Sequence, residues 1–197
     1  MQQPLVFHNT AAAILFFASA ILVNGIEIAL RPRSSSSSDS SSGRDWTLLS
    51  IYVLTLAAMA GAVVTAELHV APLGGNPWVW VAAGVGLLWA GFAFRMWAIF
   101  TLGRFFQVTV VVQDGHRVVE SGPYRWVRHP GYLGAIVGLI GVGIAEGDWA
   151  SIAIMLTGGL AAFLIRIHVE ERVLLAELGD DYAAFSKRRA RLVPGLY

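Results

Sequence analysis

The residues best suited to chemistry gather in two polar blocks in the C-terminal half of the chain. The first block covers residues 101–132 and ends in the dense segment Gly-Pro-Tyr-Arg-Trp-Val-Arg-His-Pro-Gly-Tyr, residues 122–132. The second covers residues 166–197 and contains the adjacent carboxylates Glu170 and Glu171. Arginine, histidine, tyrosine and carboxylate side chains can bind polar ligands and orient reacting groups. Together the two blocks predict a compact polar pocket.

The dense segment lies on a constrained loop that leads into a helix. Gly122 and Pro123 form a turn signal, and Pro130 favours a helix start because its missing N–H is not needed there. Free N–H groups at a helix start attract anions. Structural roles stay open for the same residues: the arginines as interfacial anchors, the aromatic residues as a membrane belt and His129 as a packing residue.

The composition indicates an integral membrane protein. Of the 197 residues, 56% are hydrophobic and 14% are charged, whereas a soluble domain carries about 25% charged residues. The chain has no cysteine, which excludes disulfides, thiolate metal sites and a cysteine nucleophile. Its five scattered histidines predict no metal site, and its net charge of +1 predicts no nucleic-acid partner.

Five apolar stretches predict an all-α fold with about five transmembrane helices. They are residues 11–30, 48–66, 78–100, 131–145 and 149–165. A crossing helix needs about 20 residues, with a range of about 17–25, so the first three qualify easily. The last two are short and are separated by a polar turn, residues 146–148. We expect them to form a C-terminal helical hairpin, with its second helix continuing past the membrane.

The basic residues predict the orientation. They lie in the loop after the first stretch, after the third stretch and in the C-terminal tail, and residues 1–10 have none. Cytoplasmic segments carry an excess of Lys and Arg, so we expect the N-terminus outside and both polar blocks on the cytoplasmic side. Two charged residues lie inside predicted helices near that side, Glu27 and Arg95, and we expect Arg95 to pair with Glu27 or another carboxylate.

The chain divides into two predicted regions. Residues 1–100 hold three N-terminal transmembrane helices with a serine-rich flexible linker at 34–42. Residues 101–197 form the catalytic region, which consists of a loop at 101–130, the hairpin at 131–165 and a C-terminal segment at 166–197. A β-branched run at residues 107–112 could form one short strand.

The ordered motifs of the second region resemble those of the isoprenylcysteine carboxyl methyltransferases and their prokaryotic relatives. The resemblance covers about residues 90–197. It rests on these elements: Thr101-Leu102-Gly103-Arg104-Phe105-Phe106, Gly122-Pro123-Tyr124-Arg125-x-x-Arg128-His129-Pro130-x-Tyr132-x-Gly134, Glu170-Glu171-x-x-Leu174, Leu178-Gly179-Asp180-x-Tyr182-x-x-Phe185 and Arg191-Leu192-x-Pro194.

The resemblance implies an integral membrane enzyme that uses S-adenosylmethionine in a cytoplasmic-side pocket. A lipophilic or prenylated carboxylate would enter from the bilayer and take the methyl group directly, at the inner membrane if the chain is prokaryotic. The candidate catalytic residues are Arg95, Arg125, Arg128 and Glu171. The candidate cofactor-binding residues are Gln107, Gly122, Tyr124, Arg128, His129, Tyr132, Glu170 and Tyr182. We expect membrane lipids as partners, and neither nucleic acid nor metal.

The sequence departs from the family pattern at several points. Phe185 stands where the family often has tyrosine, and Arg188-Arg189 replaces a region that often carries threonine. The predicted five spans are fewer than the eight of the larger eukaryotic enzymes. The substrate of those enzymes is therefore not assigned to this chain. Three alternatives stay open: a phospholipid or other lipid N-methyltransferase, a sterol-reductase-like enzyme that uses NADPH, and a non-catalytic membrane scaffold.

Overall fold

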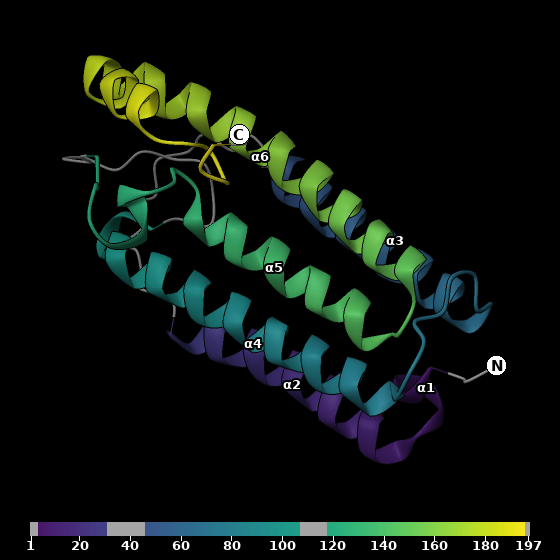
Figure 1. Ribbon diagram of the computed structural model, residues 1–197. Helices are drawn as coiled ribbons and strands as arrows, with labels where there is room; N and C mark the ends of the chain where they lie inside the picture. Colours follow the sequence, from purple (N-terminus) through teal and green to yellow (C-terminus); the bar gives the residue numbers. More distant parts are fainter. Residues whose placement is uncertain (1–3, 31–45, 107–117, 196–197) are drawn as a thin grey trace.

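The computed structural model describes residues 4–30, 46–106 and 118–195, and these residues are helical or lie in turns and loops, without a β-strand. Figure 1 shows the arrangement. The α-helices are α1 (Leu5–His8), α2 (Thr10–Leu30), α3 (Trp46–Glu67), α4 (Pro77–Leu102), α5 (Pro130–Ala145) and α6 (Trp149–Arg188). Two short 3₁₀ helices, η1 (Gly103–Phe105) and η2 (Gly122–Arg125), lie on either side of residues 107–117, which the structure does not describe.

The prediction of an all-helical integral membrane protein is confirmed. Helices α2, α3, α4 and α6 are long and apolar enough to cross a membrane, and α5 is an apolar helix of 16 residues. The fourth predicted crossing, at residues 131–145, is therefore shorter than the usual range, and the fifth, at 149–165, is the first part of the long helix α6. The serine-rich linker 34–42 and the expected strand at 107–112 lie outside the described residues. The orientation relative to the two membrane faces stays a prediction.

The long helices lie side by side in the order α2, α4, α5, α6 and α3 (Figure 1). Helices α4 and α5 approach most closely because glycines face each other between them. A Cβ atom added at Gly91 would lie 2.5 Å from the carbonyl oxygen of Gly134, and one added at Gly134 would lie 2.6 Å from the carbonyl oxygen of Gly91. Small residues bring membrane helices together in this way, and here they fix the start of α5 against α4.

The turn between α5 and α6 is tied to the α3–α4 loop by Asp148. Its Oδ1 accepts hydrogen bonds from the backbone N–H groups of Ala150 and Ser151, at 2.8 and 3.3 Å, and so caps α6. Its Oδ2 accepts a hydrogen bond from the N–H of Ala71 at 2.8 Å. The hairpin predicted at 131–165 is present as α5, this turn and the first part of α6.

The end of α6 bends back toward the loop that precedes α5. Gly179 has a φ of 52°, which breaks the helix and favours a residue without a side chain. Beyond this break the chain returns, and the N–H groups of Arg128 and His129 donate to the carbonyl oxygens of Ala190 and Arg191 at 2.8 and 3.1 Å. This contact closes the second polar block onto the first.

Candidate active site

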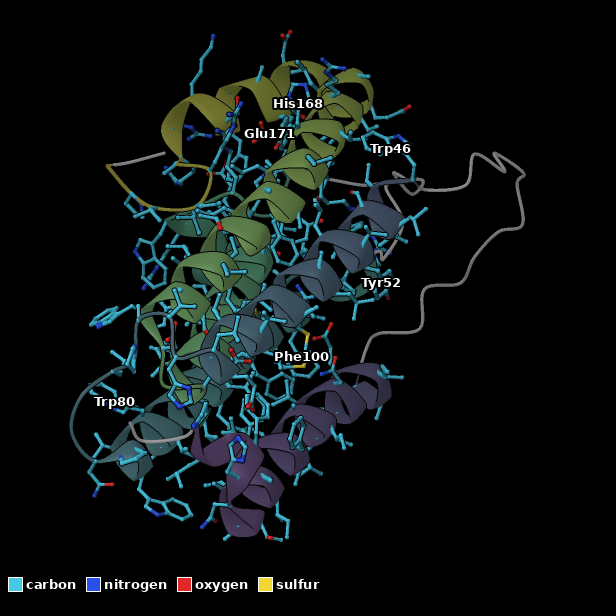
Figure 2. The ribbon with its side chains drawn as sticks, turned by 90° about the vertical axis from the view of Figure 1, so that its right-hand side faces the viewer. Trp46, Tyr52, Trp80, Phe100, His168 and Glu171 are labelled. Carbon is cyan, nitrogen blue, oxygen red and sulfur yellow. The ribbon has the colours of Figure 1, made fainter. Side chains whose placement is uncertain are left out.

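Glu171 lies at the centre of a cluster of cationic side chains. Its Oε1 is 2.8 Å from Nη1 of Arg128 and 3.2 Å from Nε2 of His129, and its Oε2 accepts a hydrogen bond from Nε of Arg191 at 3.0 Å. The Glu171 side chain is only 12% exposed. Figure 2 shows this residue at the same end of the bundle as His168 and Trp46. The cluster joins three segments that are distant in the sequence.

Glu170 belongs to a second, adjacent network. The hydroxyl of Tyr132 donates to Oε2 of Glu170 at 2.6 Å, and Nε of Arg166 donates to the same hydroxyl at 3.4 Å. Arg166 is 2% exposed, and it also donates from Nη1 to the hydroxyl of Thr47 in the first turn of α3. Helices α3, α5 and α6 therefore meet through one buried guanidinium.

Stacked rings line the boundary between the two networks. The His129 and Tyr132 rings stack with their centroids 5.7 Å apart, and the Tyr132 and Phe163 rings stack at 5.3 Å. His129 and Phe163 are buried and Tyr132 is half-buried. Because rings packed on both faces have little rotational freedom, this stack holds the Tyr132 hydroxyl toward Glu170.

Arg95 is held by a different set of partners. Its Nε and Nη2 donate to the two carboxylate oxygens of Glu27 at 3.0 and 2.8 Å, and its Nη1 donates to the carbonyl oxygen of Gly131 at 3.0 Å. The expected pairing with Glu27 is therefore found. This bidentate contact connects α2, α4 and the first turn of α5, so it fixes the helix that carries Tyr132.

Arg125 is not brought to the Glu171 cluster. Its guanidinium lies 4.0 Å from the ring centroid of Trp126, and the Trp126 ring packs edge-to-face on Trp97 at 5.9 Å. All three side chains are exposed. This geometry matches an interfacial cation–π contact, and a catalytic role for Arg125 stays a prediction.

Two more of the site residues predicted from the sequence, Gly122 and Tyr124, lie together in the short helix η2. Gly122 begins η2, and Tyr124 in the same turn is buried. Burial raises the pKa of Tyr124 well above 10, with a further increase from the charge of Glu170 and an opposing effect of Arg95, so its hydroxyl keeps its proton at neutral pH. Gln107 lies outside the described residues.

Two buried polar atoms near the cluster have no hydrogen-bond partner among the described residues. They are the hydroxyl of Tyr182 and Nε of Arg128. Tyr182 is packed against Phe185 beyond the break in α6, and the charges of Glu171 and Arg128 act on it. Because buried polar groups are nearly always paired in folded proteins, these two atoms mark a place where a polar ligand would supply the partners.

Three residues of the site were not predicted as such from the sequence. Arg191 contacts Glu171, and its place in the Arg-Leu-x-Pro element was the signal available. Arg166 lies near a predicted helix end and four residues before Glu170, and this spacing suggested an ion pair on one helix face but no place in the site. Thr47 carries no local signal, because its contact with Arg166 depends on how α3 packs against α6.

Comparison with protein families supports this assembly. A family model described as isoprenylcysteine carboxyl methyltransferase (ICMT) family matches residues 84–176. The matched segment includes most of α4, the loop before α5, the hairpin and both glutamates.

Curated relatives agree with the family model over a similar length. The protein-S-isoprenylcysteine O-methyltransferase of Schizosaccharomyces pombe is 28% identical over 118 residues, which cover 59% of this chain and 50% of that protein. The methanethiol S-methyltransferase of Mycobacterium tuberculosis is 31% identical over 117 residues, which cover 55% of this chain and 47% of that protein. The chain thus spans about half the length of these curated relatives.

A solved structure shares the fold. The eukaryotic intramembrane Ras methyltransferase ICMT superposes with a TM-score of 0.64 at 19% sequence identity, over 98% of this chain and 71% of that one. The protein is therefore an integral membrane protein with the helical fold of that methyltransferase. Its resemblance to the isoprenylcysteine carboxyl methyltransferase family is confirmed over residues 84–176.

Proposed function

We propose that this protein is an S-adenosylmethionine-dependent membrane methyltransferase that acts on a lipophilic carboxylate. The observation that carries the proposal is the meeting of three motif segments at Glu171. Arg128 and His129 from the loop before α5 and Arg191 from the C-terminal segment all contact this one carboxylate. The family match covers two of these segments, the loop before α5 and the part of α6 with Glu171, and supports the chemistry.

The residues present fit the proposed cofactor. S-adenosylmethionine carries ribose hydroxyls, a carboxylate and an ammonium group, which together offer both acceptors and donors. The unpartnered Tyr182 hydroxyl and Arg128 Nε supply buried groups that need partners. Glu170, with one oxygen bonded to Tyr132, could accept hydrogen bonds from the ribose hydroxyls through its other oxygen. Tyr124, His129 and Gly122 would form the walls nearest the loop.

When bound, the cofactor supplies a methyl group that is already activated by its positive sulfur. A carboxylate acceptor is ionised at neutral pH, so the protein need not provide a general base for it. The contribution of this chain would be positioning and the exclusion of water. The buried Nε of Arg128 has no partner among the described residues, and we assign Arg128 the task of orienting the acceptor carboxylate.

The proposal includes an orientation of the protein across the membrane. The N-terminus would face the outside, and the Glu171 end of the bundle would face the cytoplasm, at the inner membrane if the chain is prokaryotic. The basic residues at that end, including Lys187 and Arg188, support this orientation. The lipophilic substrate would reach the site laterally from the bilayer.

Cofactor binding to the detergent-purified protein tests the proposal. S-adenosylmethionine, S-adenosylhomocysteine and NADPH would be titrated separately against the wild type, His129→Ala and the exposed-site control Arg172→Gln. We expect binding of the first two ligands, loss in His129→Ala and no change in the control. Binding of NADPH alone would favour the reductase-like alternative. A folded protein that binds none of the three, with or without lipid, would contradict the proposal.

One relative favours a second candidate acceptor. The methanethiol S-methyltransferase of Mycobacterium tuberculosis acts, by its name, on a thiol. A thiol must lose its proton before it attacks, so the rate with a thiol acceptor should rise with pH toward the thiol pKa. With a carboxylate acceptor the rate should be nearly constant above about pH 6. With an amine acceptor the rate would also rise with pH. Competition by lipophilic thiols and by lipophilic amines would then show which of these two acceptors the protein uses.

A further inference from the structure

A small cavity lies at the end of the bundle opposite to the Glu171 cluster. It is lined by α1, the α3–α4 loop, the start of α4 and the α5–α6 turn, and its volume is about 20 Å³. Trp80, one of its lining residues, lies at the opposite end from Glu171 in Figure 2. A cavity must offer about 10–15 Å³ to hold a water molecule. This one is therefore large enough to hold a water molecule.

Glu146 presents a buried carboxyl group to this cavity. The residue is 3% exposed, and its Oε2 has no hydrogen-bond partner among the described residues. A buried carboxylate oxygen without a donor is costly, because it has lost its water and gained nothing in return. The group therefore needs either a proton of its own or a donor inside the cavity.

His69 presents a second unpartnered atom to the same cavity. Its Nδ1 is 2.8 Å from the carbonyl oxygen of Glu67. A carbonyl oxygen only accepts hydrogen bonds, so Nδ1 carries the hydrogen and Nε2 of the neutral ring is an acceptor. This Nε2 is buried and has no partner in the described part of the chain. His69 also lines the cavity.

Among the polar side chains that line the cavity, Glu146 and His69 are the two with unpartnered atoms in the described part of the chain. Asp148 lines the cavity too, but backbone N–H groups occupy both of its oxygens. Helix α4 contributes Pro77 and Trp80 to the wall, and α1 contributes only apolar residues. The His8–Glu67 pair, at 3.1 Å, lies nearby but is exposed and does not line the cavity.

An ionised Glu146 and Nε2 of His69 are both hydrogen-bond acceptors, so neither can donate to the other. The hydrogen between them must come from a bound proton or from a water. We propose that this cavity is a proton-binding site, in which Glu146 takes up a proton and one buried water connects it to Nε2 of His69. In the protonated state Glu146 donates to the water, and the water donates to His69. In the ionised state the water donates one hydrogen to each group. The site would thereby couple the α3–α4 loop to the α5–α6 turn.

Infrared spectroscopy of the detergent-purified protein tests this proposal directly. A protonated carboxyl group has a carbonyl stretch that an ionised carboxylate lacks. We expect a buried protonated-carboxyl band near pH 6 that disappears by pH 8 and is missing in Glu146→Gln. The matched control is Glu67→Gln at the same end of the bundle, which should keep the band. A band that is absent from the wild type, or unchanged in Glu146→Gln, would overturn the proposal.

A second variant tests the connection to His69. His69 has a φ of 54°, a backbone conformation that asparagine tolerates, so His69→Asn removes the imidazole with little backbone strain. We expect the pH at which the band disappears to shift in this variant and not in Glu67→Gln. An identical titration in His69→Asn would show that Glu146 binds its proton without His69 and would overturn the coupling. An experimental structure should show one water between the two atoms.

Discussion

The Tyr132 hydroxyl donates to Oε2 of Glu170 across 2.6 Å, and this bond links the first turn of α5 to α6. The geometry makes Tyr132 a positioning residue for the carboxylate that we assign to the cofactor. Arg166, one turn before Glu170 on α6, donates to the same hydroxyl. The orientation of Glu170 therefore depends on two helices at once.

Replacement of Tyr132 by phenylalanine tests this dependence. The change removes the hydroxyl and keeps the ring stacked between His129 and Phe163. A hydrogen bond to a charged group contributes about 1.5–3 kcal/mol, so we expect the Kd for S-adenosylmethionine to rise at least about tenfold. Isothermal titration calorimetry measures this, and Phe163→Leu controls for the stack. Unchanged affinity would assign the bond to folding alone.

Arg191 is expected to act through Glu171. Replacing it with glutamine removes one of the charged contacts of this carboxylate and loosens the C-terminal segment that docks on the loop before α5. We expect cofactor binding to weaken by roughly tenfold, with little change in thermal stability because Arg191 is partly exposed. Arg172→Gln, an exposed change on α6, should bind normally. Equal affinity in both variants would argue against a cofactor at this cluster.

The Glu27–Arg95 pair is expected to act on stability. Both side chains are mostly buried, with exposures of 12% and 18%. Glu27→Gln leaves Arg95 without its charge partner, which should cost roughly 3 kcal/mol of stability. Thermal unfolding in detergent measures the loss, and Arg95→Gln should give a similar value with no further loss in the double variant. If Arg95→Gln abolishes turnover in a protein as stable as wild type, Arg95 is catalytic as the sequence suggested.

The close contact between α4 and α5 predicts a large difference between two glycine substitutions. A Cβ at Gly91 would collide with backbone atoms of Gly134 and Gly138, whereas a Cβ at Gly86 on the same helix meets nothing within 4 Å. Gly91→Ala should therefore destabilise the protein by at least about 2 kcal/mol. Gly86→Ala should be neutral or slightly stabilising, since alanine favours helix. Equal melting temperatures would contradict the observed packing.

Stability should also depend on pH through Glu146. Burial raises the pKa of this carboxyl from 4.5 to about 7, a hydrogen bond from Ser151 opposes the increase and the charge of Asp148 adds to it. The folded state therefore binds more protons than the unfolded state between about pH 4.5 and 7. Stability should fall as pH rises through this window, by about 3 kcal/mol, and then level off. Thermal unfolding of Glu146→Gln should lose this slope.

Much of the fold could be predicted from the sequence because its signals are local. A run of apolar residues of membrane length forms a helix wherever it lies, since the backbone must satisfy its own hydrogen bonds in lipid. The polar turn at residues 146–148 and Pro130 mark the ends of α5 for equally local reasons. The order of the motifs likewise indicated which segments would form the site.

The tertiary structure decided which of these residues meet. Arg95, Arg125 and Arg128 look alike in the sequence, yet the first pairs with Glu27, the second lies over Trp126 and the third reaches Glu171. The break at Gly179 returns the chain to the loop before α5, and no periodicity predicts where it docks. Side-chain partners across helices depend on their relative rotation and spacing, which close packing of the whole bundle fixes.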